Sequence, residues 1–193
     1  RELRIPPTVR HIFPEACVGI KSLRKVNIPD YCRVYAGAFA QCGIEELILG
    51  EHVLLETGCF YGIRAKQVNI PDTTKWRMFG PEDYEDVEYY DPHNELLPVS
   101  ADNIRDFIAV VFCKSIWHYM ELLKRARKGD EWAKRELASG ISSMNFMISV
   151  TQNESLYKPP FTPDEILSHL DENEKHWISQ FEENQERMNS SED

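Results

Sequence analysis

The sequence predicts an α+β protein in which a short solenoid of parallel strands, with coils of 21–23 residues, precedes a small helical bundle. The pentapeptide Val-Asn-Ile-Pro-Asp occurs twice, at 26–30 and at 68–72, which is an offset of 42 residues. From Ser100 onward, apolar residues recur at the three- and four-residue spacing of amphipathic helices. A third observation is a series of Ile-Pro pairs, one of them replaced, spaced by 23, 21 and 21 residues: Ile5-Pro6, Ile28-Pro29, Leu49-Gly50 and Ile70-Pro71.

A repeat of this length is too short for two helices and suits one coil of a solenoid that carries a short strand. Val26 and Ile28 alternate with Lys25 and Asn27, so we expect the apolar pair to point into the solenoid. Pro29 then ends the strand because proline has no N–H for a parallel ladder. We therefore expect residues 1–79 to form the solenoid, with each coil burying its apolar side chains against its neighbours.

Two stretches carry the repeat most clearly, IPPTVRHIFPEACVGIKSLRKVNIP at 5–29 and IPDYCRVYAGAFAQCGIEELIL at 28–49. They resemble the BspA-type leucine-rich repeat, whose units read roughly IP-x-x-V-x-x-I-x-x-x-AF-x-x-C-x-x-L-x-x-I-x-IP. The resemblance covers residues 1–72 and departs from the pattern at Leu49-Gly50 and at Ile63. It implies a solenoid that binds a protein partner with its strand face and is not an enzyme. Leu3-Arg4-Ile5 has the form of the end of an earlier repeat, so we expect further repeats before Arg1.

The side chains that point away from the solenoid form the predicted binding surface. With Val26 and Ile28 inside, Lys25 and Asn27 face outward, and the same register holds in the neighbouring coils. Equivalent outward positions of successive coils would form two rows. One contains Glu2, Lys25, Glu46 and Gln67, and the other contains Arg4, Asn27, Ile48 and Asn69. The predicted partner-binding residues are Lys25, Asn27, Glu46, Ile48, Gln67 and Asn69. The alternative interpretation is a solvated strand face that binds nothing.

Residues 80–99 form a predicted acidic and aromatic linker, or cap, that follows the solenoid. Residues 81–95 contain seven acidic residues and three tyrosines but no Lys or Arg. The last coil needs a cover for its apolar edge, and Trp76, Met78 and Phe79 are candidates for it. The alternative function is an acidic inhibitor or decoy that occupies a basic site on a partner. Its docking residues would be Glu82, Asp83, Glu85, Asp86 and Glu88.

Residues 100–193 form a predicted three-helix module with an acidic tail. The first helix is expected to begin at Ser100 or Asp102 and to run to about Lys128, where Gly129-Asp130 ends it and starts the second. Thr162-Pro163-Asp164-Glu165 is the start signal of the third. An enzyme with its site in this module is the third hypothesis. Its candidates are Cys113 with His118, and a metal set of His169, Glu172 and His176, but neither spacing is a known motif.

Composition and charge exclude several classes of function. Residues 1–80 hold 11 Lys and Arg against 8 Asp and Glu, whereas residues 81–193 hold 11 against 24, which indicates two different modules. No basic stripe suggests nucleic acid, and no apolar run approaches the roughly 20 residues of a membrane helix. The five cysteines have no CxxC spacing and suggest buried thiols of an intracellular protein, although the resembled family is common at cell surfaces. We therefore expect a non-enzymatic protein-binding module without cofactor or metal.

Overall fold

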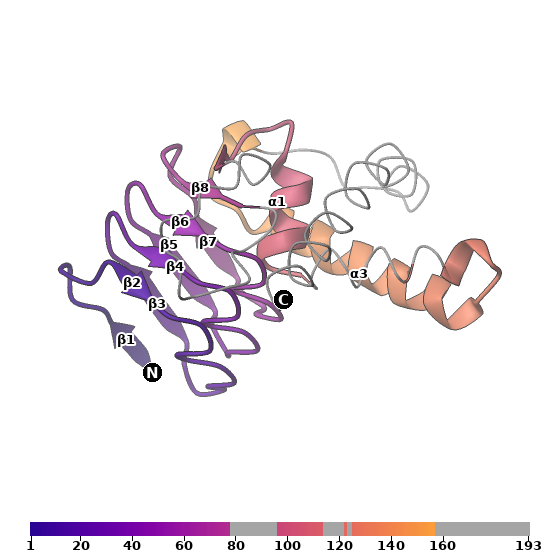
Figure 1. Cartoon of the computed structure of the whole chain (residues 1–193), viewed down its shortest axis with the longest axis horizontal. Coiled ribbons are helices and arrows are strands. Elements are labelled where there is room, and N and C mark those ends of the chain that lie inside the picture. The colour runs from indigo at the N-terminus through magenta and orange to yellow at the C-terminus, as the bar shows by residue number, and fades with distance from the viewer. Residues whose placement is uncertain (78–95, 114–121, 123–124, 157–193) are drawn as a thin grey trace, which may run out of the picture.

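A computed structural model describes residues 1–77, 96–113, 122 and 125–156. Residues 1–77 wind into a parallel β-solenoid whose coils stack along one axis (Figure 1). Sheet A has the strand order β1 (Glu2–Arg4), β3 (Lys25–Ile28), β5 (Glu46–Leu49) and β7 (Gln67–Asn69). Sheet B contains β2 (His11–Ile12), β4 (Arg33–Val34), β6 (Leu54–Leu55) and β8 (Lys75–Trp76), with β9 (Leu97–Pro98) at its edge. The predicted solenoid and its repeat length are confirmed.

The strands of sheet A pair in the register that the repeats predict. Lys25 lies opposite Glu2 on one side and Glu46 on the other, and Asn27 lies between Arg4 and Ile48. The alternating positions point inward, since Val26, Leu47 and Val68 have no exposed surface. Stacking these side chains from coil to coil builds the solenoid core, because each coil covers the apolar side chains of the next.

Each coil contains two strands, where the sequence predicted one. The second strands are the pairs of sheet B, and they place Val34, Leu55 and Trp76 in the core without exposed surface. A two-residue strand shows only one inward and one outward position. It is therefore too short to produce the alternating pattern by which a strand is recognised in a sequence.

The third side of each coil is a turn segment that carries a ladder of phenylalanine rings. Phe39 stacks on Phe60 with the ring centroids 5.4 Å apart, and Phe60 stacks on Phe112 at 5.8 Å. The Phe39 amide donates to the Cys59 carbonyl at 2.8 Å, and the Phe60 amide donates to the Val111 carbonyl at 3.1 Å. Val111 and Phe112 thus take the place of a further coil, although they lie some distance along the chain.

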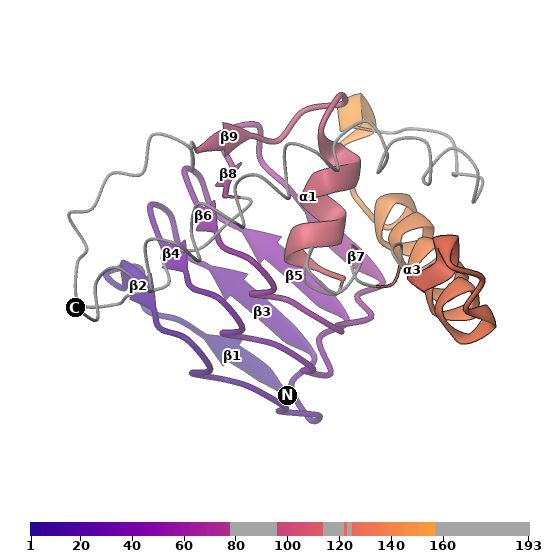
Figure 2. The ribbon, with the colours of Figure 1, turned by 45° about the vertical axis from the view of Figure 1, so that its right-hand side comes forward.

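Three separate segments close the C-terminal end of the solenoid. β9 pairs antiparallel with β8, and Thr151 forms a parallel bridge with Val68 of β7. The end of α1 (Ile104–Val111) pairs with the third side. Trp76, a candidate for the cover, lies instead within β8, where its ring meets Phe107 of α1 edge to face at 5.9 Å. Figure 2 shows the N-terminus and β1 at one end of the stack and β9 at the other.

The helices differ from the prediction in one respect. α1 ends at Val111, and neither Phe112 nor Cys113 is helical, so the expected continuous helix to Lys128 is wrong. The Phe112 carbonyl accepts a bond from the Gly62 amide at 3.1 Å, and this pairing with the solenoid competes with helix continuation. The third predicted helix lies outside the described residues.

α3 (Glu131–Ser149) begins where the sequence predicts. The Asp130 side chain accepts hydrogen bonds from the amides of Trp132 and Ala133, at 2.9 and 3.1 Å, as an N-cap does. α3 packs against α1 and extends away from the coils (Figure 1), and a short 3-10 helix, η1 (Glu154–Leu156), follows it. Within the described ranges, no helix combines the length and apolarity needed to cross a bilayer.

All five cysteines lie in the described part of the chain, and none forms a disulfide. Four of them are buried, and Cys17 is half-buried. Burial raises the pKa of the Cys32 thiol to about 11, and it also raises the pKa of Cys59. These thiols therefore act as small apolar side chains in the core, as the sequence predicts.

Candidate functional site

The outer face of sheet A carries the residues that the sequence proposes as a binding surface. Lys25, Glu46 and Gln67 form one row across β3, β5 and β7. The Lys25 ammonium lies 2.7 Å from Glu46 Oε1, and both side chains keep about a third of their surface exposed, at 35% and 36%. This ion pair links adjacent coils and leaves polar atoms of both residues open to a ligand. Gln67, which ends the row, is exposed.

The second row places a polar atom without a partner beside an apolar side chain. Asn27 and Ile48 lie opposite each other on β3 and β5, and Asn69 follows on β7. Asn27 Oδ1 is buried and accepts no hydrogen bond from the described residues. A buried acceptor without a donor costs free energy, so Asn27 gains a hydrogen bond if its amide turns outward and a ligand N–H or O–H donates to the oxygen. Ile48 is half-buried and gives an apolar contact point next to it.

The structure brings all six predicted partner-binding residues onto one face, within adjacent strands. Their role in binding stays a prediction. The residues of the acidic alternative lie outside the described residues: Glu82, Asp83, Glu85, Asp86 and Glu88. The same holds for His118 and for the metal candidates His169, Glu172 and His176. In the described ranges, no group of three or more His, Cys, Asp or Glu side chains is arranged to hold a metal ion.

Sequence reasoning missed a second row of interacting side chains, formed by the residues that directly follow the strands of sheet B. Arg33 Nε donates to Glu56 Oε1 at 2.6 Å, and the guanidinium lies 4.5 Å from the centroid of the Tyr35 ring. Tyr35 also stacks with Phe13 at 5.5 Å. Phe13, Tyr35, Glu56 and Arg77 are spaced by 22, 21 and 21 residues, so the repeat length alone could have found this row. The two-residue strands that precede it hid the signal.

Glu56 is the buried acid of this row, with 1% of its surface exposed. Burial raises the pKa of its carboxyl above the ordinary value of 4.5, although the Arg33 guanidinium opposes the shift. A carboxyl with a raised pKa binds its proton more tightly in the folded chain than in the unfolded chain. Its favourable contribution is therefore fully present below pH 4.5 and is lost as the pH rises through the folded-state pKa.

We expect the Glu56→Gln variant to lack the pH dependence of stability that the Glu56 carboxyl gives the wild-type chain. Gln is neutral at every pH, so the wild-type chain should gain stability relative to the variant as the pH falls from neutral toward 4.5. Urea unfolding of both chains across that range measures the difference. Parallel profiles for the two chains, or a relative loss by the wild type, would contradict the assigned shift.

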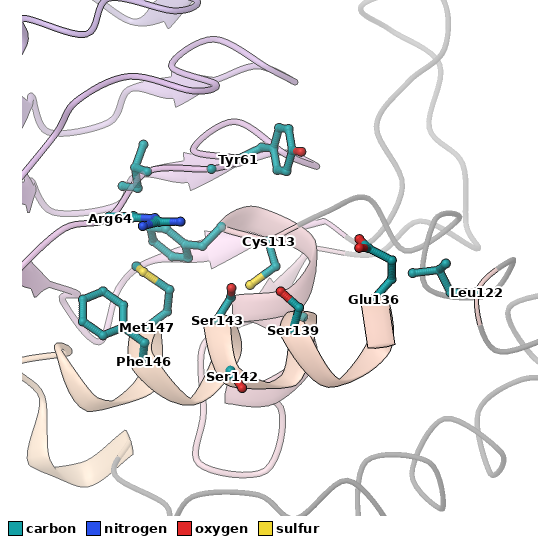
Figure 3. Close-up of a pocket in the computed structure, with 14 residues that line it drawn as sticks. Tyr61, Arg64, Cys113, Leu122, Glu136, Ser139, Ser142, Ser143, Phe146 and Met147 are labelled. Atoms are coloured by element: carbon teal, nitrogen blue, oxygen red, sulfur yellow. The ribbon is translucent and has the colours of Figure 1, made fainter. Parts of the chain in front are cut away.

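A cavity of about 530 Å³ lies between the solenoid and α3. Its wall combines Tyr61 and Arg64 of the third coil, Phe112 and Cys113 after α1, and serines with Met147 on α3 (Figure 3). Its described wall contains one carboxylate, from Glu136, and no imidazole that could activate the Cys113 thiol. The described residues of this cavity therefore form no recognisable catalytic set, and the face of sheet A is the better candidate site.

Comparison of the chain with models of protein families, with curated proteins and with solved structures finds no match. The function must therefore be argued from the solenoid and its surfaces. The resemblance to the BspA-type leucine-rich repeat stays a prediction that rests on the repeat pattern.

Proposed function

We propose that this chain is a non-enzymatic module that recognises a protein partner through the outer face of sheet A. One observation carries the proposal: Asn27 presents a buried oxygen without a partner directly beside the half-buried Ile48, at the centre of two rows of side chains. Parallel strands hold successive residues of each row about 4.8 Å apart, so the positions of the side chains are set by the scaffold before a partner arrives.

The chemistry of the face favours a protein over other ligands. Its central pair offers one hydrogen-bond acceptor and one aliphatic contact, and the surrounding Lys25–Glu46 pair and Asn69 provide a polar rim. A mixture of an apolar centre and a polar rim is typical of protein interfaces. We infer that the solenoid belongs to the BspA-type leucine-rich repeat class, which is consistent with this use of the strand face.

The test compares two aliphatic residues of the same coil. Ile48 on β5 and Leu54 on β6 are both half-buried outward residues, but they lie on different sheets. Affinity capture from the source cells, followed by mass spectrometry, identifies proteins that the wild-type chain retains. Ile48→Lys is expected to weaken binding of the partner about tenfold or more, because it places a charge in the apolar centre. Leu54→Lys is the matched control and should keep the affinity within a factor of about two.

The opposite result would contradict the proposal. If Leu54→Lys releases the partner and Ile48→Lys does not, binding uses sheet B. If both variants retain the partner and charge reversal at Glu82 and Asp83 releases it, the acidic segment is the decoy that occupies a basic site on the partner. Circular dichroism of each variant separates lost binding from lost folding.

A further inference from the structure

Two arginines flank one buried carboxylate beside sheet B, in three consecutive coils. The Glu56 amide donates to the Val34 carbonyl at 3.0 Å, so the parallel ladder continues one residue past β6. The Arg77 amide donates to the Leu55 carbonyl at 3.2 Å, so the same is true of β8. The backbones of Glu56 and Arg77 are therefore neighbours, about 4.8 Å apart. Arg33, on β4, contacts Glu56 from the coil on the other side.

The charges of this group do not balance. The Nε atom of Arg33 donates to Glu56 Oε1 at 2.6 Å, and a terminal nitrogen of the same guanidinium contacts the same oxygen. Among the described residues, Arg77 forms no ion pair, and its buried Nε atom donates no hydrogen bond. Two guanidiniums and one carboxylate leave an excess of one positive charge. A partly buried charge without a partner costs free energy, so an anion that reached Arg77 would be stabilised there.

The electrostatics of Arg77 agree with this count. Burial lowers the pKa of its guanidinium and the positive charge of Arg33 lowers it further, whereas Glu56 opposes the shift. The one described carboxylate is therefore not enough to offset the burial and the second guanidinium. Both arginines also keep part of their surface open to solvent: the Arg33 side chain is 17% exposed, and Arg77 is half-buried. A solute can reach them.

We propose that Arg77, with Arg33 near it, binds a carboxylate that the described residues do not supply. A carboxylate carries one negative charge, which balances the excess of one. Its two oxygens also match two parallel N–H groups of a guanidinium, and Arg77 Nε is one such group. Phosphate at neutral pH carries nearly two negative charges and would leave the site negative, so the charge count favours the carboxylate. The site lies beside sheet B and does not depend on what sheet A binds.

Two sources can supply the carboxylate. One is a separate molecule, either a small acid or an acidic side chain of another protein. The other is the chain itself, because residues 81–95 contain seven acidic residues and follow Arg77 closely in the sequence. The binding chemistry is the same for both sources, and the experiment is arranged to distinguish them.

Nuclear magnetic resonance of the full chain of 193 residues tests the site directly. Sodium acetate is the probe, and it replaces chloride at constant ionic strength while the Nε–Hε resonances of Arg33 and Arg77 are followed. The Arg77 resonance should shift and saturate. Arg77→Gln, followed at Arg33, should raise the dissociation constant of acetate about tenfold or more. Arg64→Gln removes the same charge at an exposed position beside α3 and should change that constant by a factor of about two at most.

Glu56→Gln tests the charge count in the opposite direction. This substitution removes the only carboxylate of the group and leaves two guanidiniums without compensation. It should therefore lower the dissociation constant of acetate about threefold or more. If Glu56 only held Arg33 in place, its loss would loosen the site and acetate would bind more weakly. Circular dichroism of each variant confirms that the chain is folded before its binding is compared.

A variant without five of the acidic residues identifies the source of the carboxylate. It replaces Glu with Gln and Asp with Asn at Glu82, Asp83, Glu85, Asp86 and Glu88. Equal affinity of this variant and the wild type for acetate assigns the site to a separate molecule. A variant that binds acetate at least tenfold more tightly than the wild type, or that alone responds, shows that the chain's own acidic residues occupy the site.

Three results overturn the proposal. The first is an Arg77 resonance that acetate shifts in neither the wild type nor this neutralised variant. The second is a folded Glu56→Gln chain that binds acetate more weakly than the wild type. The third is inorganic phosphate that saturates the Arg77 shift at a concentration tenfold lower than acetate does, since the site would then prefer a doubly charged anion.

Discussion

Replacing Phe60 with alanine is expected to lower the free energy of unfolding by about 4 kcal/mol. The ring has no exposed surface and stacks between Phe39 and Phe112, at 5.4 and 5.8 Å. Its removal leaves a cavity that the neighbouring rings cannot fill without leaving their stack. The loss also separates two parts of the protein, because Phe60 is the ring through which the third coil contacts the segment that follows α1.

Chemical unfolding followed by circular dichroism measures the loss, and hydrogen exchange locates it. The amides of Phe60 and Gly62, which donate to the carbonyls of Val111 and Phe112, should exchange faster in the variant. Phe60→Leu keeps most of the volume and should cost less, about 1.5 kcal/mol. Phe13→Ala, at an exposed ring of the same type, should change stability by about 0.5 kcal/mol at most. A Phe60→Ala variant as stable as Phe13→Ala would show that the ring ladder does not hold the end of α1.

Gly50→Ala is expected to cost about 3 kcal/mol, because the new methyl group overlaps the backbone of the preceding coil. A Cβ atom at Gly50 would lie 2.7 Å from the Asp30 amide nitrogen and 2.8 Å from the Pro29 carbonyl carbon. Neither atom can rotate away, as the end of a side chain could. The Gly50 amide also donates to the Ile28 carbonyl at 2.8 Å, a bond that proline at this position could not make.

Gly19→Ala is the control for the Gly50 substitution. Gly19 has a φ of +73° and nothing within 4 Å of its added Cβ, so alanine there costs only the left-handed conformation, about 1 kcal/mol. Thermal unfolding of both variants should rank them in that order. Equal losses would show that the coils can separate at Gly50 without a penalty.

The inward-facing and outward-facing side chains of sheet A could be predicted because the same pattern recurs in several coils. Val26 and Val68 are in equivalent places of two coils, and both are fully buried. The neighbouring Asn27 and Asn69 belong to one outward row for the same reason. Their difference could not be predicted: Asn27 lies between two neighbouring strands and has a buried Oδ1, whereas Asn69 on the last strand of the sheet is exposed.

The Gly50 position shows a departure from the repeat that became clear only in three dimensions. By sequence, Leu49-Gly50 is a degenerate Ile-Pro pair. In the structure, Gly50 permits a close approach of two coils, because its missing side chain leaves room for Asp30. The contact between Gly50 and Asp30 joins residues about one coil apart, and the residues around Gly50 in the sequence do not predict it.

The sequence by itself determined the repeat length, the solenoid, and which side chains of sheet A point inward and outward. These features depend on side chains that recur at a regular spacing, and the recurrence is visible in the printed letters. The tertiary structure decided where the solenoid ends and what closes it. Leu97, Val111 and Thr151 complete the last coil through backbone groups. Almost every residue has the same backbone N–H and C=O, so pairing through them leaves no mark in a sequence.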